Sequence, residues 1–125
     1  MSGLLDTSVF VASESGRPLA SLPDEGHVSV ITVAELRIGV LVADDPSIRA
    51  QRMRTLSAVE ALDALPVDDA VARVFSAIVA DGRRHSRRPT ILDALIAATA
   101  VSRGMPVYTQ DVDFEDMPGV EVVRV

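Results

Sequence analysis

Residues 3–12 read GLLDTSVFVA, and this stretch sets the fold that we expect for the whole chain. Gly3 to Leu5 are typical of a short buried strand, and a helix follows that Asp6 or Thr7 caps. A strand that passes directly into a helix is the first part of a β–α–β unit. In parallel sheets built from such units, ligands bind at the carboxyl ends of the strands. Asp6 stands at that end of the first predicted strand.

Strands and helices continue to alternate outward from this stretch. The pattern predicts strands at residues 3–5, 27–30, 106–109 and 120–125, and helices at about 9–12, 32–42, 46–65, 68–79 and 90–104. Alternation of this kind implies a central parallel sheet flanked by helices on both faces, a three-layer α/β fold. At 125 residues the chain has the length of one domain, which we expect to span residues 1–125.

The composition excludes several classes of enzyme. About 48% of the residues are apolar and only four are aromatic, so the core must be mainly aliphatic. The chain has no cysteine, which excludes disulfides, cysteine nucleophiles and thiolate metal sites. Its 12 Lys and Arg positions are all Arg. Without lysine, phosphate-loop ATPases, Schiff-base enzymes and Ser–Lys hydrolases are excluded.

The charge balance bears on partners and location. Eighteen acidic residues against 12 Arg give a formal net charge of −6, which argues against a passive nucleic-acid coat. The first residues lack the basic region of a signal peptide. Glu35, Arg37 and Asp93 interrupt the best apolar stretches, so we predict no membrane segment. The expected location is the cytoplasm.

Five acidic residues fall where the sheet should have its ligand-binding edge. Asp6 follows the first predicted strand, and Asp111 and Asp113 follow the strand at 106–109. Glu35 and Asp93 lie in the first turns of predicted helices. Helix capping is the simpler explanation for each acid alone, since Thr32-x-x-Glu35 and Thr90-x-x-Asp93 resemble capping boxes. Capping explains less well why all of them fall at one edge.

Convergence of these carboxylates would require a counterion. Two carboxylates about 4 Å apart repel by roughly 4 kcal/mol at an effective dielectric constant near 20. A group of them therefore either raises its pKa values or binds a cation. A site of oxygen ligands without Cys or His favours Mg²⁺ or Mn²⁺, ions that commonly serve phosphoryl chemistry.

Four short motifs occur in order along the chain. They are LLDTSVF at 4–10, AELRIGV at 34–40, DALIAATA at 93–100 and YTQDVDF at 108–114, with a turn MPGV at 117–120 before the last strand. This ordered set resembles the PIN domain, specifically the VapC-type toxin ribonucleases of bacterial type II toxin–antitoxin pairs. The resemblance spans nearly the whole chain.

The resemblance implies a Mg²⁺-dependent endoribonuclease, with Mn²⁺ as a substitute, in which metal-activated water attacks a phosphodiester in line and leaves a 5′-phosphate. It also implies a cognate antitoxin that covers the site, and a homodimer or a toxin–antitoxin hetero-oligomer. The catalytic and metal-binding roles that it implies fall on Asp6, Glu35, Asp93 and Asp111. Asp113 would be a further ligand, or would orient the other ligands without contacting the metal ion itself. Thr7 or Ser8 would orient a carboxylate or a metal-bound water.

The segment RRHSRR at 83–88 is more basic than the family pattern leads us to expect. Arg84, Arg87 and Arg88 are candidates for binding substrate phosphates beside Asp93, because Arg grips phosphate bidentately. A solvated helix end is the equally simple alternative. The other Arg-rich segment, at 49–54, could contact a partner protein.

Two other functions stay open at this point. One is a non-catalytic PIN-like interaction module whose acidic residues are structural. The other is a phosphatase that uses an Asp nucleophile after the first strand, although the lack of lysine counts against its familiar versions.

Overall fold

The computed structural model describes residues 1–125. The elements in chain order are β1 (Ser2–Leu5), α1 (Thr7–Glu14), β2 (Glu25–His27), α2 (Val30–Leu41), α3 (Pro46–Glu60), α4 (Asp69–Arg84), α5 (Ile91–Ser102), β3 (Val107–Thr109), the 3₁₀ helix η1 (Val112–Asp116) and β4 (Val122–Arg124). The four strands form one sheet in the order β2-β1-β3-β4, and every neighbouring pair is parallel. The predicted parallel α/β architecture is confirmed.

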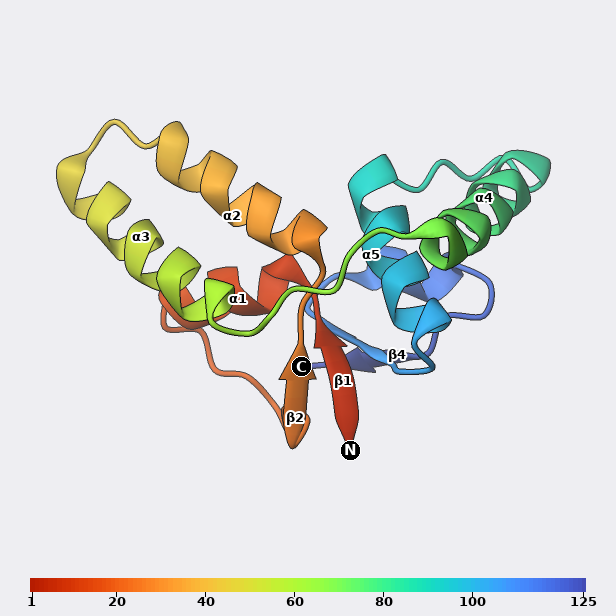
Figure 1. Ribbon diagram of the computed structural model, residues 1–125, viewed down its shortest axis with the longest axis horizontal. Coiled ribbons are helices and arrows are strands. Elements are labelled where there is room, and N and C mark those ends of the chain that lie inside the picture. The colour runs from red at the N-terminus through yellow and green to blue at the C-terminus, as the bar shows by residue number, and fades with distance from the viewer.

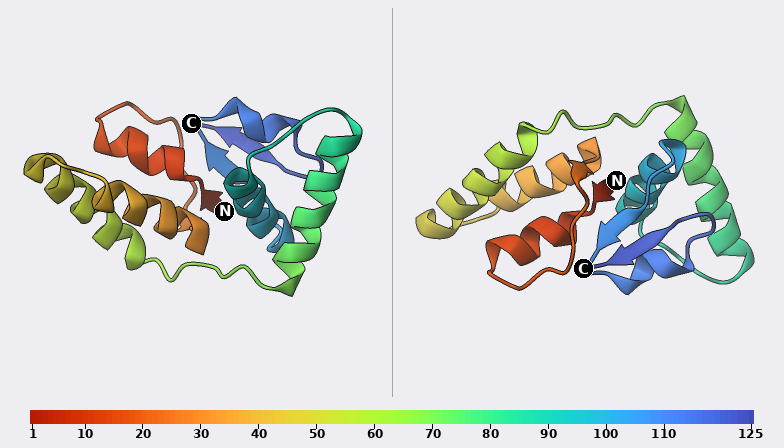
Figure 2. Two further views of the ribbon diagram at one scale, coloured as in Figure 1. Left: turned by 90° about the horizontal axis from the view of Figure 1, so that it is seen from above. Right: turned by 90° about the horizontal axis from the view of Figure 1, so that it is seen from below.

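Helices cover both faces of the sheet, as alternating side chains along the central strands require. Leu4 and Val107 are paired neighbours whose side chains enter a core shared with α4 and α5. Leu5 and Tyr108, one residue further along, enter a second core with residues of α1, α2 and α3. Figure 2 shows the sheet between these two groups of helices. The three-layer arrangement is therefore confirmed.

The two helix groups lie on either side of the carboxyl ends of the strands. In Figure 1, β1 and β2 point upward, with the α2–α3 pair on one side and the α4–α5 pair on the other. None of the helices has the combined length and apolar character that a membrane span requires.

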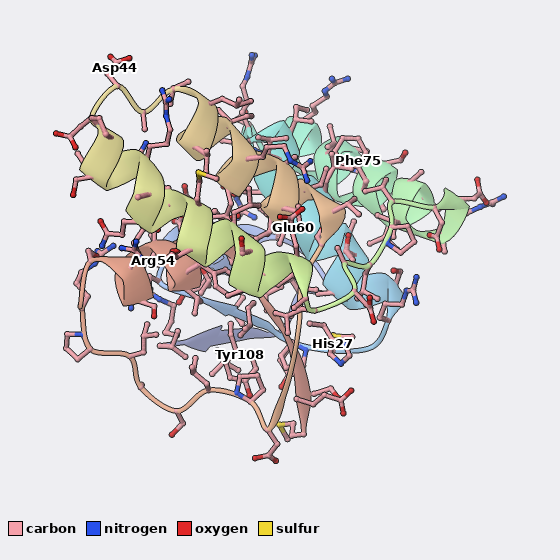
Figure 3. All side chains as sticks on the ribbon, turned by 60° about the vertical axis from the view of Figure 1, so that its left-hand side comes forward. His27, Asp44, Arg54, Glu60, Phe75 and Tyr108 are labelled. Atoms are coloured by element: carbon pink, nitrogen blue, oxygen red, sulfur yellow. The ribbon has the colours of Figure 1, made fainter.

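Two Arg residues of the Arg-rich segment at 49–54 close the α2–α3 hairpin. The guanidinium of Arg49 donates to the carbonyl of Ala43 through both Nε (3.1 Å) and Nη2 (2.6 Å). Arg52 Nη1 donates to the carbonyl of Gly39 at 2.7 Å. These bonds satisfy carbonyls near the C-terminus of α2 that have no helical donor. Figure 3 shows Asp44 at the tip of this hairpin.

Several predicted boundaries are wrong by a few residues. The second strand is Glu25–His27 rather than 27–30, because Ser29 is the N-cap of α2 and accepts a hydrogen bond from the Ile31 amide. Consequently the capping box predicted at residues 32–35 does not form, and Glu35 lies in the second helical turn rather than the first. Helix α3 ends at Glu60, short of the predicted 65, and the chain continues to a parallel bridge between Ser29 and Leu65.

Two of the predicted helices also end differently. Helix α4 runs to Arg84 rather than 79, so its last turn carries part of the basic segment. Helix α5 begins at Ile91 with Thr90 as its N-cap, as predicted, and ends at Ser102. Gly104 follows with a φ of +67°, the left-handed conformation that glycine adopts most readily after a helix.

The glycine at position 3 is required by the packing of the sheet. A Cβ atom built there would collide with the ring of Tyr108, which covers this part of β1 from the neighbouring strand β3. Tyr108 is labelled in Figure 3. The first residue of the opening stretch thus makes room for the largest side chain of β3.

Candidate metal centre

Asp6 is the most deeply placed of the candidate acidic residues. It follows β1, caps α1 and is only 4% exposed. Its Oδ2 atom accepts hydrogen bonds from the hydroxyls of Ser8 (2.7 Å) and Thr109 (2.9 Å). Its other oxygen, Oδ1, accepts no hydrogen bond from the protein. One oxygen is therefore held in place while the other is available to a ligand.

Glu35 reaches the same region from α2. Its Oε1 atom accepts a hydrogen bond from the hydroxyl of Thr7 at 2.7 Å, and that hydroxyl lies 3.1 Å from the hydroxyl of Thr32. Glu35 is half-buried, and its Oε2 atom accepts no hydrogen bond from the protein. The contact fixes a side chain of α2 against the start of α1, next to Asp6.

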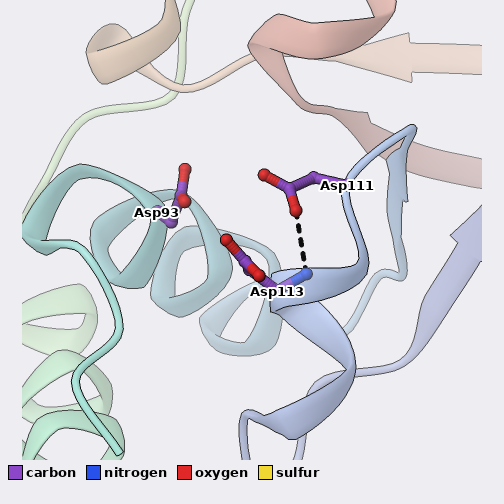
Figure 4. A group of neighbouring side chains, drawn as sticks. All are labelled: Asp93, Asp111 and Asp113. Carbon is purple, nitrogen blue, oxygen red and sulfur yellow. Dashed lines mark hydrogen bonds between the residues drawn. The ribbon is translucent and has the colours of Figure 1, made fainter.

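The remaining three acids come together from α5 and the segment after β3. Asp93, Asp111 and Asp113 each offer a carboxylate oxygen, and these three atoms lie within 4.8 Å of one another, close enough to hold one metal ion (Figure 4). Asp111 caps η1 by accepting a hydrogen bond at Oδ1 from the amide of Asp113 (2.9 Å). Asp93 and Asp111 are half-buried, whereas Asp113 is exposed.

The charges of Asp6 and Glu35 affect the pKa of Asp93, one of these three residues. The pKa of Asp93 is raised from its ordinary value of 3.8, chiefly because burial disfavours the charged carboxylate. A hydrogen bond with Thr90 opposes this shift. The charges of Asp6, Asp111 and Glu35 each raise the pKa further. The charge of Asp93 is therefore influenced by carboxylates from three other segments of the chain.

The raised pKa of Asp93 predicts how the stability of the metal-free protein depends on pH. Because its folded pKa lies above 3.8, Asp93 stabilises the folded state fully below that pH and loses the contribution as pH rises through the folded value. We expect the melting temperature of wild type minus that of Asp93→Asn to decrease from pH 4 to pH 7, when both are measured in EDTA. Added Mg²⁺ should restore wild type near neutral pH. A difference that is constant over this range would contradict the prediction.

Thr109 is the residue of this site that the sequence pattern did not reveal. It is fully buried, donates its hydroxyl to Asp6 Oδ2 and accepts a hydrogen bond from the amide of Asp111 at 2.9 Å. The Ser8 hydroxyl lies 3.2 Å away and also accepts from the amide of Gln110. In the sequence Thr109 reads only as the last residue of a strand. A hydroxyl two residues before an Asp at a strand end was the available signal.

The basic segment divides into two parts. Arg87 donates from Nη1 to the carbonyl of Asp116 at 3.2 Å, and with Arg88 it lines a hollow that also contains Asp113. Arg84 instead borders a separate hollow with Phe75, which is labelled in Figure 3. Of the three predicted substrate-binding residues, Arg87 and Arg88 thus lie beside the acidic cluster and Arg84 does not.

The fold and this cluster define a class of protein: a parallel α/β domain whose strand ends carry a carboxylate site able to hold a divalent cation. The PIN domain family matches residues 3–120. The chain is 49% identical to ribonuclease VapC5 of Mycobacterium tuberculosis (strain ATCC 25618 / H37Rv), covering 98% of this chain and 95% of that protein. It is 40% identical to ribonuclease VapC4 of the same strain, with the same coverage of both chains.

A solved structure agrees with these relatives. The crystal structure of VapBC-5, a member of the VapBC family of toxin–antitoxin systems from Mycobacterium tuberculosis, matches with a TM-score of 0.89 and 45% identity. The match covers 99% of this chain and 98% of that chain. The chain therefore belongs to the PIN domain family, in its VapC-type branch, and the resemblance seen in the four motifs is confirmed.

Proposed function

We propose that this protein is the toxin of a type II toxin–antitoxin pair and a Mg²⁺-dependent endoribonuclease. The observation that carries the proposal is the convergence of acidic residues from four segments, in which one oxygen of each of three carboxylates is fixed by the protein and the other is left available. The identity to two relatives named as VapC ribonucleases supports the same activity.

Asp6, Glu35, Asp93 and Asp111 would hold Mg²⁺, with Mn²⁺ as a substitute, and Asp113 would add a ligand from the exposed side. Bound there, the ion supplies an activated water and offsets negative charge on the phosphate. Ser8 orients Asp6, and Thr7 orients Glu35, through the hydrogen bonds described above.

The remaining parts of the proposal concern RNA and partners. Arg87 and Arg88 would contact substrate phosphates next to the metal centre, and Arg84 would contact the strand further away. We further propose a cognate antitoxin, a homodimer or a toxin–antitoxin hetero-oligomer, and action in the cytoplasm. The similar VapBC-5 structure comes from a toxin–antitoxin system, which supports the first of these. Residues 1–125 would form a single PIN domain.

Cleavage of RNA by the purified protein tests the activity. We expect single-stranded RNA to be cut in Mg²⁺, with 5′-phosphate ends, and to stay intact in EDTA, because the clustered carboxylates repel one another and phosphate without a cation. Mg²⁺ should also raise the melting temperature. If the folded protein cuts no RNA and its melting temperature does not change on addition of Mg²⁺, the interaction-module alternative is favoured.

A further inference from the structure

A polar hollow lies beside the metal centre. It has a volume of about 180 Å³ and is formed between the last turns of α4, the segment leading to α5 and the region of η1 and the residues after it. Asp113 of the acidic cluster and Thr90, the cap of α5, both line it. A group seated there would therefore lie directly beside the proposed site of phosphodiester cleavage.

The size of the hollow limits what it can hold. Pockets that enclose drug-sized ligands measure about 300–1,000 Å³, whereas a water molecule takes about 30 Å³ in the liquid. A space of about 180 Å³ lies between these values and suits one planar group of the size of a nucleobase. Met117, Pro89 and Pro118 supply apolar contacts for the face of such a ring.

The walls of the hollow are held in place by the backbone. Gly82 allows the segment after α4 to fold back on the helix, since a Cβ there would lie 2.9 Å from both the carbonyl oxygen of Arg87 and Cδ of Pro89. The Arg87 amide donates to the Gly82 carbonyl at 2.6 Å. On the opposite side, the Arg87 guanidinium bonds the carbonyl of Asp116. These contacts hold the walls of the hollow in place.

Donors and acceptors occur together in its lining. The side chains of Arg87 and Arg88 present only hydrogen-bond donors, whereas the carboxyl groups of Asp81 and Asp116 present acceptor oxygens. Guanine offers the matching set: O6 and N7 accept from Arg, and the neighbouring N1–H and N2–H₂ groups donate to a carboxylate. Adenine, cytosine and uracil lack this combination of two adjacent acceptors and two adjacent donors.

We propose that this hollow seats an unpaired guanine of the RNA strand, next to the phosphodiester that is cut. The proposal rests on the proposed ribonuclease function and assigns the base preference to Asp81 and Asp116 together with Arg87 and Arg88. Single-stranded RNA is the suitable substrate, because proteins read its bases on their exposed edges and stack them on Arg or apolar side chains.

The test is the sequence context of cleavage. Wild type in Mg²⁺ is given single-stranded RNAs that carry each of the four bases at every position around the cut, and the product ends are sequenced. We expect one position beside the cut to favour guanine. Asp116→Asn and Asp81→Asn, which replace an acceptor oxygen by a donor NH₂, should lower the ratio of cleavage at guanine to cleavage at the other bases by about 10-fold. Melting temperatures confirm that the variants are folded.

Asp69→Asn is the matched control, since Asp69 lies at the other end of α4 and is ion-paired with Arg73. This variant should show the same ratio of cleavage at guanine to cleavage at the other bases as wild type. Cleavage without any preference for guanine, or a guanine ratio that Asp81→Asn and Asp116→Asn leave unchanged, overturns the proposal while the ribonuclease function stands. Weaker antitoxin binding by these variants with an unchanged guanine ratio also overturns it and assigns the hollow to the protein partner. Complete lack of cleavage by wild type refutes the proposed function instead.

Discussion

Replacing Asp93 by asparagine is expected to reduce RNA cleavage by about 100- to 1,000-fold while the protein becomes more stable in the absence of metal. The carboxylate is half-buried and faces the charges of Asp6, Asp111 and Glu35, so its ionised form is costly unless a cation is bound. Asparagine keeps the shape of the side chain and removes the charge. The same substitution therefore removes a proposed metal ligand and relieves repulsion.

Two measurements separate these effects. Cleavage rates at several Mg²⁺ concentrations report the loss of activity, and melting temperatures at pH 7 with EDTA or Mg²⁺ report stability. We expect Asp93→Asn to melt above wild type in EDTA and to lose most of the increase that Mg²⁺ produces in wild type. Asp44→Asn, at the tip of the α2–α3 hairpin (Figure 3), should behave as wild type in both assays. Undiminished cleavage by folded Asp93→Asn would refute the site assignment.

The general position of the site followed from the sequence because parallel sheets place their ligands at the strand ends. Asp6, Asp111 and Asp113 could be placed there from their positions after strands alone. Glu35 and Asp93 required the further step that the helix starts face the same edge. The structure groups Asp93 with Asp111 and Asp113, and the charge of Glu35 contributes to the raised pKa of Asp93. The error in the helix that carries Glu35 did not matter, since α2 starts only two residues earlier than predicted and Glu35 lies within the helix in both cases.

Capping and ligand binding appeared as competing explanations of the acidic residues, yet the structure combines them. Asp6 caps α1 and Asp111 caps η1, each through one carboxylate oxygen. Because a carboxylate has two oxygens, a capping hydrogen bond to one oxygen fixes the side chain and leaves the other oxygen free to bind a metal ion. The helix starts thus orient the carboxylates. Capping residues at the strand ends of such a sheet are therefore compatible with a metal site rather than evidence against one.

Features that depend on contacts between distant segments could not be predicted. The short strand Glu25–His27 is defined by its pairing with β1, and no local pattern separates it from residues 28–30. The hollow beside the metal centre depends on Gly82, whose importance is visible only when the segment that folds back on α4 is in place. Thr109 is the same kind of case, because its partners lie about 100 residues away in the chain.

Thr109→Val should weaken Mg²⁺ binding by about 10- to 100-fold, the usual effect of removing a group that orients a metal ligand. Valine has nearly the same shape, but it cannot donate to Asp6 Oδ2 or accept from the Asp111 amide. Asp6 then keeps only the Ser8 hydroxyl as a side-chain donor, and the amide of Asp111 loses its partner. A lost partner of this kind costs about 1–3 kcal/mol of folding free energy, so the melting temperature should also fall.

The dependence of cleavage on Mg²⁺ concentration distinguishes positioning from a merely structural role. If Thr109 acts by orienting Asp6 and Asp111, the Mg²⁺ concentration for half-maximal cleavage rises in Thr109→Val, and high Mg²⁺ recovers much of the rate. Thr109→Ser restores the hydroxyl and should return the Mg²⁺ dependence toward wild type, although the loss of a buried methyl group keeps it less stable. Reduced stability of Thr109→Val with an unchanged Mg²⁺ dependence would show that the hydroxyl serves the fold alone.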